Sequence, residues 1–142
     1  MSKDALETIE LELAILIRRL TSVSTDKRKT SLDRSGYLLL RRLSALGPAG
    51  VKVLAEEFDL DISTVSRQAR ALEDKKYVKK IPDSQDGRSY FYQITESGHA
   101  ELTANQMSRL DSITNLLSDW TDDDRENLGY LLKKFNHSLK NR

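Results

Sequence analysis

Apolar residues recur every three or four positions along most of this chain, which is the spacing of one face of an α-helix. The first run extends from Leu6 to Val23 and follows an a/d stripe for two to three heptads, so we expect a long N-terminal helix. A polar stretch, Ser24 to Thr30, interrupts the pattern. An apolar stripe of this length requires another helix to pack on, either from the same chain or from a second copy.

Three shorter helices are predicted next. Asp33 is placed to cap the first of them, which ends at Gly47-Pro48. The apolar spacing predicts a short helix over Val51–Phe58, a tight turn over Asp59–Asp61, and a third helix from Ser63, its expected N-cap, to about Lys76. Two short helices joined by a turn of this length are typical of a helix-turn-helix.

A β-hairpin is expected directly behind this motif. Two strand-like runs, Tyr77–Ile81 and Ser89–Ile94, flank a polar connection that contains Asp86-Gly87. An Asp-Gly pair between two such runs is a strong signal for a tight hairpin turn. The predicted fold is therefore mainly α with a small β-hairpin wing: a winged helix-turn-helix with long N- and C-terminal dimerisation helices.

Two further amphipathic helices complete the chain. Thr95 is expected to cap a helix over about Glu96–Asp119, and Thr121 has capping-box spacing for the last helix. A helix-turn-helix with a hairpin does not need three long amphipathic helices around it, so we expect their apolar stripes to form a homodimer interface. The residues assigned to this interface are Leu6, Leu13, Leu16, Leu20, Leu117, Trp120, Leu128, Leu131 and Phe135.

Composition excludes several classes of function. The chain has no cysteine, which excludes disulfides, thiolate nucleophiles and cysteine-based zinc sites. Its two histidines, His99 and His137, lie far apart in the sequence, and helix capping accounts for the acidic run Asp122–Asp124. No glycine-rich phosphate loop or membrane-length apolar run is present, and the N-terminal residues lack the apolar core of a signal peptide. We therefore expect a cytoplasmic protein with no enzymatic activity, metal site or cofactor.

The net charge is only +1, so any nucleic-acid face has to come from local clustering. The helix predicted from Ser63 buries Val65, Ala69 and Leu72 and turns polar side chains outward. Hydroxyls, guanidinium groups and an amide in the first turns of a helix suit base edges and phosphates in the major groove, although an ordinary solvated face has the same composition. The candidate DNA-binding residues on this helix are Ser63, Thr64, Ser66, Arg67, Gln68 and Arg70.

At this point the chain resembles the multiple-antibiotic-resistance regulator (MarR) family of bacterial winged-helix transcription factors. The resemblance extends over nearly the whole chain, and it depends on an ordered set of short motifs, each of them weak alone. These motifs are Leu54-Ala55-Glu56, Ser63-Thr64-Val65-Ser66-Arg67, Leu72-Glu73, Asp83, Asp86-Gly87-Arg88-Ser89 and Ile94-Thr95-Glu96-Ser97-Gly98.

The resemblance gives the wing a role in DNA binding. It implies that Arg88, just past the Asp-Gly turn, enters the minor groove and that Asp86 orients it. The alternative is a surface ion pair that contributes less than about 1 kcal/mol to stability. Lys52 is a further phosphate candidate. Four more lysines either neutralise phosphates or keep an edge strand soluble: Lys75, Lys76, Lys79 and Lys80.

The resemblance also implies an effector. Members of the family bind small aromatic anions in a cleft between the DNA-binding lobe and the dimer helices. In this sequence the candidate wall residues are Tyr37, Leu40 and Arg41. The alternative is that Tyr37 and Leu40 are ordinary core residues. The absence of cysteine argues against regulation by thiol oxidation.

These features together predict a sequence-specific DNA-binding transcriptional regulator, acting as a repressor on a pseudo-palindromic operator. We expect one domain, 1–142, with a DNA-binding lobe at 34–95 and dimerisation helices at 1–24 and 96–142. The expected partners are double-stranded DNA, a second copy of the chain and a small aromatic or phenolic effector, with no membrane. The alternative is a winged-helix adaptor that binds proteins and would carry an apolar patch on the exposed face of the helix from Ser63.

Overall fold

The computed structural model describes residues 3–23 and 32–140 of the chain. The backbone contacts divide the chain into two compact units, Met1–Thr30 and Ser31–Arg142, and each is described by itself. In the first unit α1 spans Lys3–Val23, and most of the apolar side chains at 3–21 are exposed. The predicted polar break, 24–30, lies outside the described residues.

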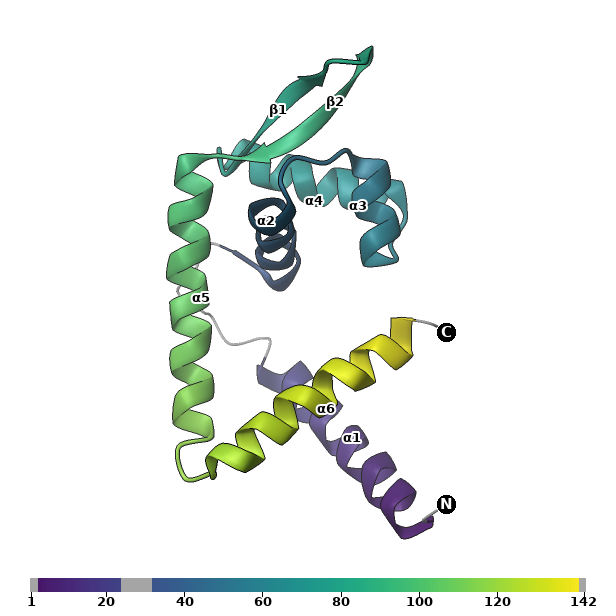
Figure 1. Ribbon diagram of the computed structural model, residues 1–142, viewed down its shortest axis with the longest axis vertical. Coiled ribbons are helices and arrows are strands. Elements are labelled where there is room, and N and C mark those ends of the chain that lie inside the picture. The colour runs from purple at the N-terminus through teal and green to yellow at the C-terminus, as the bar shows by residue number, and fades with distance from the viewer. Residues whose placement is uncertain (1–2, 24–31, 141–142) are drawn as a thin grey trace. The chain divides into compact units, whose positions relative to one another are not determined.

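The second unit contains five helices and a two-stranded antiparallel sheet among its described residues (Figure 1). The elements are α2 (Arg34–Leu46), α3 (Val51–Phe58), α4 (Ile62–Asp74), β1 (Val78–Asp83), β2 (Asp86–Ile94), α5 (Glu96–Leu116) and α6 (Asp122–Lys140). This order confirms the predicted mainly α fold with a hairpin wing. Within the described part of the chain, no helix has the length and apolarity needed to cross a membrane.

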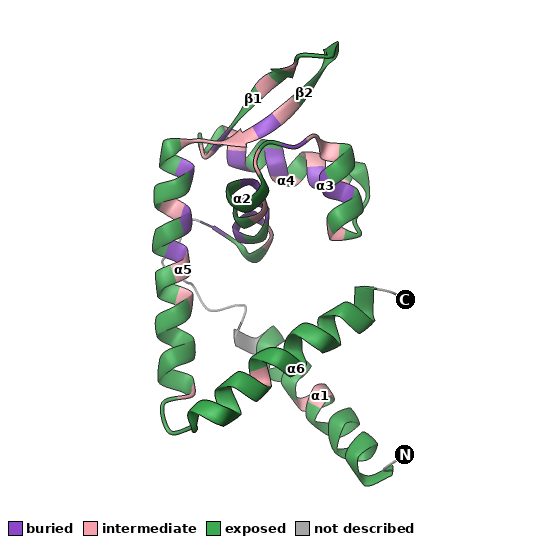
Figure 2. Ribbon diagram, viewed as in Figure 1, coloured by how far each residue is buried: buried purple, intermediate pink, exposed green. Residues whose placement is uncertain are grey.

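The hydrophobic core lies where α2, α3, α4, the base of the wing and the N-terminal half of α5 meet (Figure 2). Leu40, Leu54 and Val65 are completely inaccessible to solvent at its centre. The predicted inward face of α4 is confirmed, since its three apolar positions are all buried. Leu46 is 72% exposed, because α2 ends there and the chain turns away at Gly47.

Side-chain caps fix the helix ends. Asp33 accepts a hydrogen bond from the amide of Gly36 at 2.8 Å, and Thr95 accepts one from Gly98 at 3.0 Å, which confirms both predicted caps. The predicted cap of α4 is wrong. Asp61, and not Ser63, adopts the extended backbone conformation of an N-cap, and its carboxylate accepts a hydrogen bond from the amide of Thr64 at 2.8 Å.

The wing turns earlier than the sequence pattern predicts. Asp83 pairs with Asp86, so Ser84 and Gln85 form the turn, and Gly87 lies in β2 with an ordinary negative φ. The carboxylate of Asp83 accepts a hydrogen bond from the amide of Gln85 at 2.9 Å, which stabilises a turn at this place without glycine. The wing is consequently longer than predicted.

Two chain segments are in contact where α4 leads into β1 and where β2 leads into α5. Lys76 has a left-handed φ of 68°, and the amide of Tyr77 donates to the carbonyl of Leu72 at 2.9 Å, as in a Schellman C-cap. The carbonyl of Lys76 accepts hydrogen bonds from the hydroxyls of Thr95 at 2.7 Å and Ser97 at 2.9 Å. These contacts join the base of the wing to both helices.

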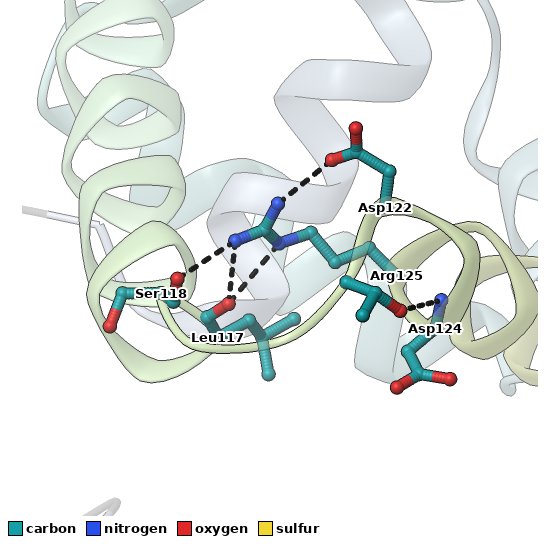
Figure 3. Close-up of polar contacts among 6 residues, drawn as sticks. Leu117, Ser118, Asp122, Asp124 and Arg125 are labelled. Atoms are coloured by element: carbon teal, nitrogen blue, oxygen red, sulfur yellow. Dashed lines mark hydrogen bonds and ion pairs between the residues drawn. The ribbon is translucent and has the colours of Figure 1, made fainter.

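A second junction holds α5 and α6 together at a corner (Figure 3). The guanidinium of Arg125 donates to the carbonyl of Leu117 at 2.8 and 3.2 Å and to that of Ser118 at 3.2 Å. It also pairs with Asp122 at 3.1 Å. Arg125 therefore satisfies carbonyls that the end of α5 leaves without helical partners and restrains the corner between the helices.

We predict that Gly98→Ala destabilises the fold by about 2–3 kcal/mol, because the chain crossing leaves no room for a side chain. A Cβ atom at this position would lie 2.2 Å from the carbonyl oxygen of Tyr77 and 2.8 Å from Cγ1 of Ile94. Urea unfolding at one fixed protein concentration measures the loss.

Gly129→Ala is the matched control, since a Cβ there meets no atom within 4 Å. Because Gly129 lies inside α6, alanine should leave stability unchanged or raise it by up to about 1 kcal/mol. Equal unfolding midpoints for the two variants would contradict the steric explanation of Gly98.

Candidate nucleic-acid interface

The outer face of α4, next to the wing, is exposed and polar. Because the opposite face packs into the core, Ser63, Arg67 and Arg70 are held in solvent, and Thr64 and Ser66 are partly exposed. The capped N-terminus orients this face, since the Asp61 carboxylate binds the first turn. Hydrogen bonds from Thr64 and Ser63, together with the charge of Arg67, lower the pKa of Asp61, so the cap stays ionised at neutral pH.

Arg67 is anchored at one point and otherwise exposed. Its guanidinium donates to the hydroxyl of Thr64 one turn earlier, at 3.4 Å. A guanidinium has five N–H donors in a planar fork, so this contact orients the group and leaves donors for a base edge or a phosphate.

Gln68 lies apart from the other polar residues of α4. It is partly buried and lines a hollow of about 140 Å³ whose other walls belong to α2, α3 and the turn after α3. The complete lining is Ser35, Leu38, Phe58, Leu60 and Gln68. The structure therefore places Gln68 at the seam between these helices, at one side of the exposed face.

Arg88 is exposed on β2 near the tip of the wing. The carboxylate of Asp86 accepts hydrogen bonds from the backbone amide of Arg88 at 3.0 Å and from the hydroxyl of Ser89 at 3.2 Å. The family resemblance implies that Asp86 orients the side chain of Arg88. The contact of Asp86 in the structure is with the backbone amide of Arg88. Asp86 shapes the tip, and the guanidinium extends from it.

Two other basic residues differ in how freely their side chains can contact a phosphate. Lys52 is exposed at the second position of α3, where the first turn of the helix adds positive potential. Arg42, in contrast, forms a two-point ion pair with Glu57 and donates to the carbonyl of Gly47 at 3.1 Å. The hydrogen bond from Arg42 lowers the pKa of Glu57. Arg42 therefore joins α2 to α3 and has little freedom to contact a phosphate.

Tyr37 is buried in the core, at 7% exposure, and contacts two guanidinium groups. Arg41 is 5.8 Å from the ring centroid and donates to the phenolic oxygen at 3.2 Å, while Arg109 of α5 is 4.1 Å from the centroid. Leu40 is fully buried in the core. Arg109 is not among the residues predicted from the sequence, although its spacing from Leu102 and buried Asn105 puts it on the inward face of α5.

Within the described ranges, no group of three or more histidine, aspartate or glutamate side chains is placed to hold a metal ion. The polar residues of α4 and the wing thus form a surface suited to contacts with phosphates and base edges, and they do not converge on a reaction centre.

Comparisons with known proteins agree with this geometry. A sequence profile of the MarR family matches residues 32–90. The chain is also 44% identical to the uncharacterized HTH-type transcriptional regulator YxaD of Bacillus subtilis, over 97% of both proteins. The chain belongs to the MarR family. It is therefore a DNA-binding transcriptional regulator of the helix-turn-helix type and not an enzyme, as the sequence predicts.

Solved structures of MarR proteins share the fold. A MarR family protein from Bacillus stearothermophilus superimposes with a TM-score of 0.79 at 16% identity, and the match covers 98% of each chain. A mutant MarR from E. coli, crystallised in complex with operator DNA, gives a TM-score of 0.63 at 23% identity and covers 74% of this chain and 76% of its own. The six helices and the two-stranded wing are therefore a MarR-like arrangement.

Proposed function

We propose that this MarR protein represses transcription by binding a pseudo-palindromic operator as a homodimer, and that a small aromatic anion releases it. The observation that carries the proposal is the pairing of an exposed, capped α4 bearing Arg67 with a wing bearing Arg88. The operator complex of the E. coli relative supports a DNA target of this kind. Genomic DNA as the target implies action in the cytoplasm.

The α4 face suits the major groove. Helices of this type read bases with side chains from their first turns, where this chain has Ser63, Thr64, Ser66 and Arg67. A guanidinium recognises guanine through two hydrogen bonds, and hydroxyls bind either bases or phosphates. Arg70, one turn after Arg67, and Lys52, at the start of α3, are assigned to the flanking phosphates.

The wing suits the adjacent minor groove. A narrow, A·T-rich minor groove concentrates negative potential and attracts an arginine inserted into it. Arg88 is exposed near the end of a two-stranded hairpin, and Asp86 holds its backbone in place. This placement lets the wing bind DNA next to the groove occupied by α4.

The homodimer is proposed from exposed apolar surface. Most large apolar side chains of α1 and α6, and those of the C-terminal half of α5, are exposed in the single chain, including Leu131 at 54% and Phe135 at 39%. A soluble monomer rarely exposes this much apolar surface. A two-fold dimer would cover these faces and present two α4 helices to half-sites about one turn of DNA apart.

The effector is proposed from the surroundings of Tyr37. The Tyr37 ring itself is buried, so the recognition is assigned to the guanidinium groups of Arg41 and Arg109 beside it, whose two positive charges suit the carboxylate of an aromatic anion. Such a ligand releases DNA only if it binds more tightly to the dimer form that cannot span the operator.

The protein-binding adaptor is the second candidate. It requires an apolar patch on the exposed face of α4, but this face carries hydroxyl and guanidinium groups, and the exposed apolar residues of α4 are limited to Ile62 and the small Ala71. The polar character of the face favours DNA.

Arg67→Ala should weaken operator binding by about 1–3 kcal/mol, because it removes a bidentate base contact. Arg88→Ala should weaken binding and relax the preference for A·T-rich flanks. Fluorescence anisotropy on an operator selected from a random DNA pool measures both effects. Arg18→Ala, an exposed arginine on α1, is the matched control for loss of charge. Unchanged affinity for both test variants would refute the proposed interface.

The homodimer predicts a mass of about 32 kDa in light scattering at micromolar concentration, twice the chain mass of 16.2 kDa. Phe135→Glu should shift the protein towards the monomer, because it introduces a charge into the apolar stripe of α6. Leu46→Glu, at an exposed leucine of the DNA-binding lobe, should leave the mass unchanged. A monomeric wild-type protein would contradict both the dimer and the two-fold operator.

Salicylate, as a probe of the effector site, should lower operator affinity, and operator DNA should lower salicylate affinity by the same factor. Arg41→Gln should weaken salicylate binding because it removes one of the two charges beside Tyr37. Calorimetry with and without operator measures both directions. Salicylate binding that leaves operator affinity unchanged would show a pocket without regulation, and no binding would refute this effector.

A further inference from the structure

Lys80 of β1 contacts two other elements of the DNA-binding lobe. Its ammonium nitrogen lies 3.9 Å from a carboxylate oxygen of Glu73 on α4 and 4.5 Å from the ring centroid of Tyr90 on β2. In this ion pair the side chain of Lys80 is 44% exposed and that of Glu73 is 32% exposed. One positive charge thus links both strands of the wing to the C-terminal end of α4.

The ring of Tyr90 continues this contact into the core. Tyr90 meets Tyr92 edge to face, with ring centroids 5.6 Å apart. Tyr92 is 3% exposed and exchanges two backbone hydrogen bonds with Ala49, at 2.9 and 3.2 Å. Burial, followed by the neighbouring Tyr90, raises the pKa of Tyr92 to about 12, so its ring stays neutral under ordinary conditions. A continuous series of contacts therefore leads from the core through the wing to α4.

We propose that Glu73, Lys80 and Tyr90, here called the wing clamp, set the angle between the wing and α4 so that Arg88 and Arg67 bind one DNA site together. The inference rests on the proposed function, since it assigns the groove contacts to these two arginines. Lys80 is then a positioning residue, and its charge is directed to Glu73 instead of a phosphate.

Such a clamp matters because the length of the wing converts a small rotation at its base into a large displacement of Arg88. A two-stranded sheet is marginally stable alone, and only the base of the wing, around Val78 and Tyr92, is buried. Arg88 lies six residues before the end of β2, about 20 Å along a strand that rises about 3.3 Å per residue. A rotation of about 10° at the base would then move Arg88 by about 3.5 Å, enough to remove a guanidinium from a narrow groove.

The direction in which one substitution changes operator affinity distinguishes the clamp from a direct contact between Lys80 and a phosphate. Glu73→Gln removes a negative charge near DNA and frees Lys80, so a phosphate-binding Lys80 would give tighter operator binding. The clamp predicts the reverse, about 3- to 10-fold weaker binding, because Lys80 loses its contact with α4. Unchanged or tighter binding by Glu73→Gln would overturn the proposal.

A double-mutant cycle tests whether Lys80 affects operator binding through Arg88. Lys80→Gln should weaken operator binding about 3- to 10-fold in the wild-type background and have little effect in the Arg88→Ala background, because the clamp acts through Arg88. Lys79→Gln is the matched control. It removes the same charge from the opposite face of β1, so its effect should be equal in both backgrounds. A Lys80→Gln loss that persists without Arg88, with a salt slope reduced by about one, would identify a phosphate contact and overturn the proposal.

Amide hydrogen exchange of the full-length protein, without DNA, tests the clamp separately from the proposed function. Exchange in 78–94 should be faster in Glu73→Gln and Lys80→Gln than in Lys79→Gln. Equal exchange in all three would overturn the clamp even if the wild type binds its operator as proposed. Faster exchange, with Arg67→Ala and Arg88→Ala both harmless to DNA binding, would refute the proposed interface and with it the positioning role.

Discussion

The crossing of two chain segments at Lys76 and Gly98 is the constraint on which the DNA-binding lobe depends. At this place α4 ends and β1 begins, while β2 passes directly into α5. The left-handed backbone at Lys76 makes the reversal, and its carbonyl accepts hydroxyl hydrogen bonds from the first turn of α5. Only glycine leaves space for the Tyr77 carbonyl beside that turn.

From this anchor, α5 connects the lobe to the exposed apolar faces without a break. Its first half is part of the core through Leu102 and Asn105, whereas Leu110 and Ile113 in its second half are exposed. The same helix therefore packs on the lobe at one end and presents apolar surface at the other. Because an α-helix is stiff over this length, a displacement at one end has to be transmitted or absorbed at the crossing or at the corner held by Arg125.

The sequence predicts those parts of the fold in which local signals and tertiary packing agree, such as the caps at Asp33 and Thr95. It fails where two local signals compete. Asp61 and Ser63 can both cap α4, and only the backbone conformation selects Asp61. Asp86-Gly87 resembles a turn more than Ser84-Gln85 does, but the Asp83 carboxylate stabilises the earlier turn. Sequence patterns indicate that Arg67 and Arg88 are exposed, but they cannot show that Arg109 stacks on Tyr37, since that contact joins distant helices.

The corner between α5 and α6 has an optical consequence. Trp120, the single tryptophan of the chain, follows the end of α5, where its amide donates to the carbonyl of Leu117 at 3.0 Å. Trp120 is 40% exposed in the single chain. Tryptophan emission therefore originates at this corner alone, and its wavelength reports the polarity around one indole. Any event that covers or opens the corner becomes a spectral shift that can be followed without a label.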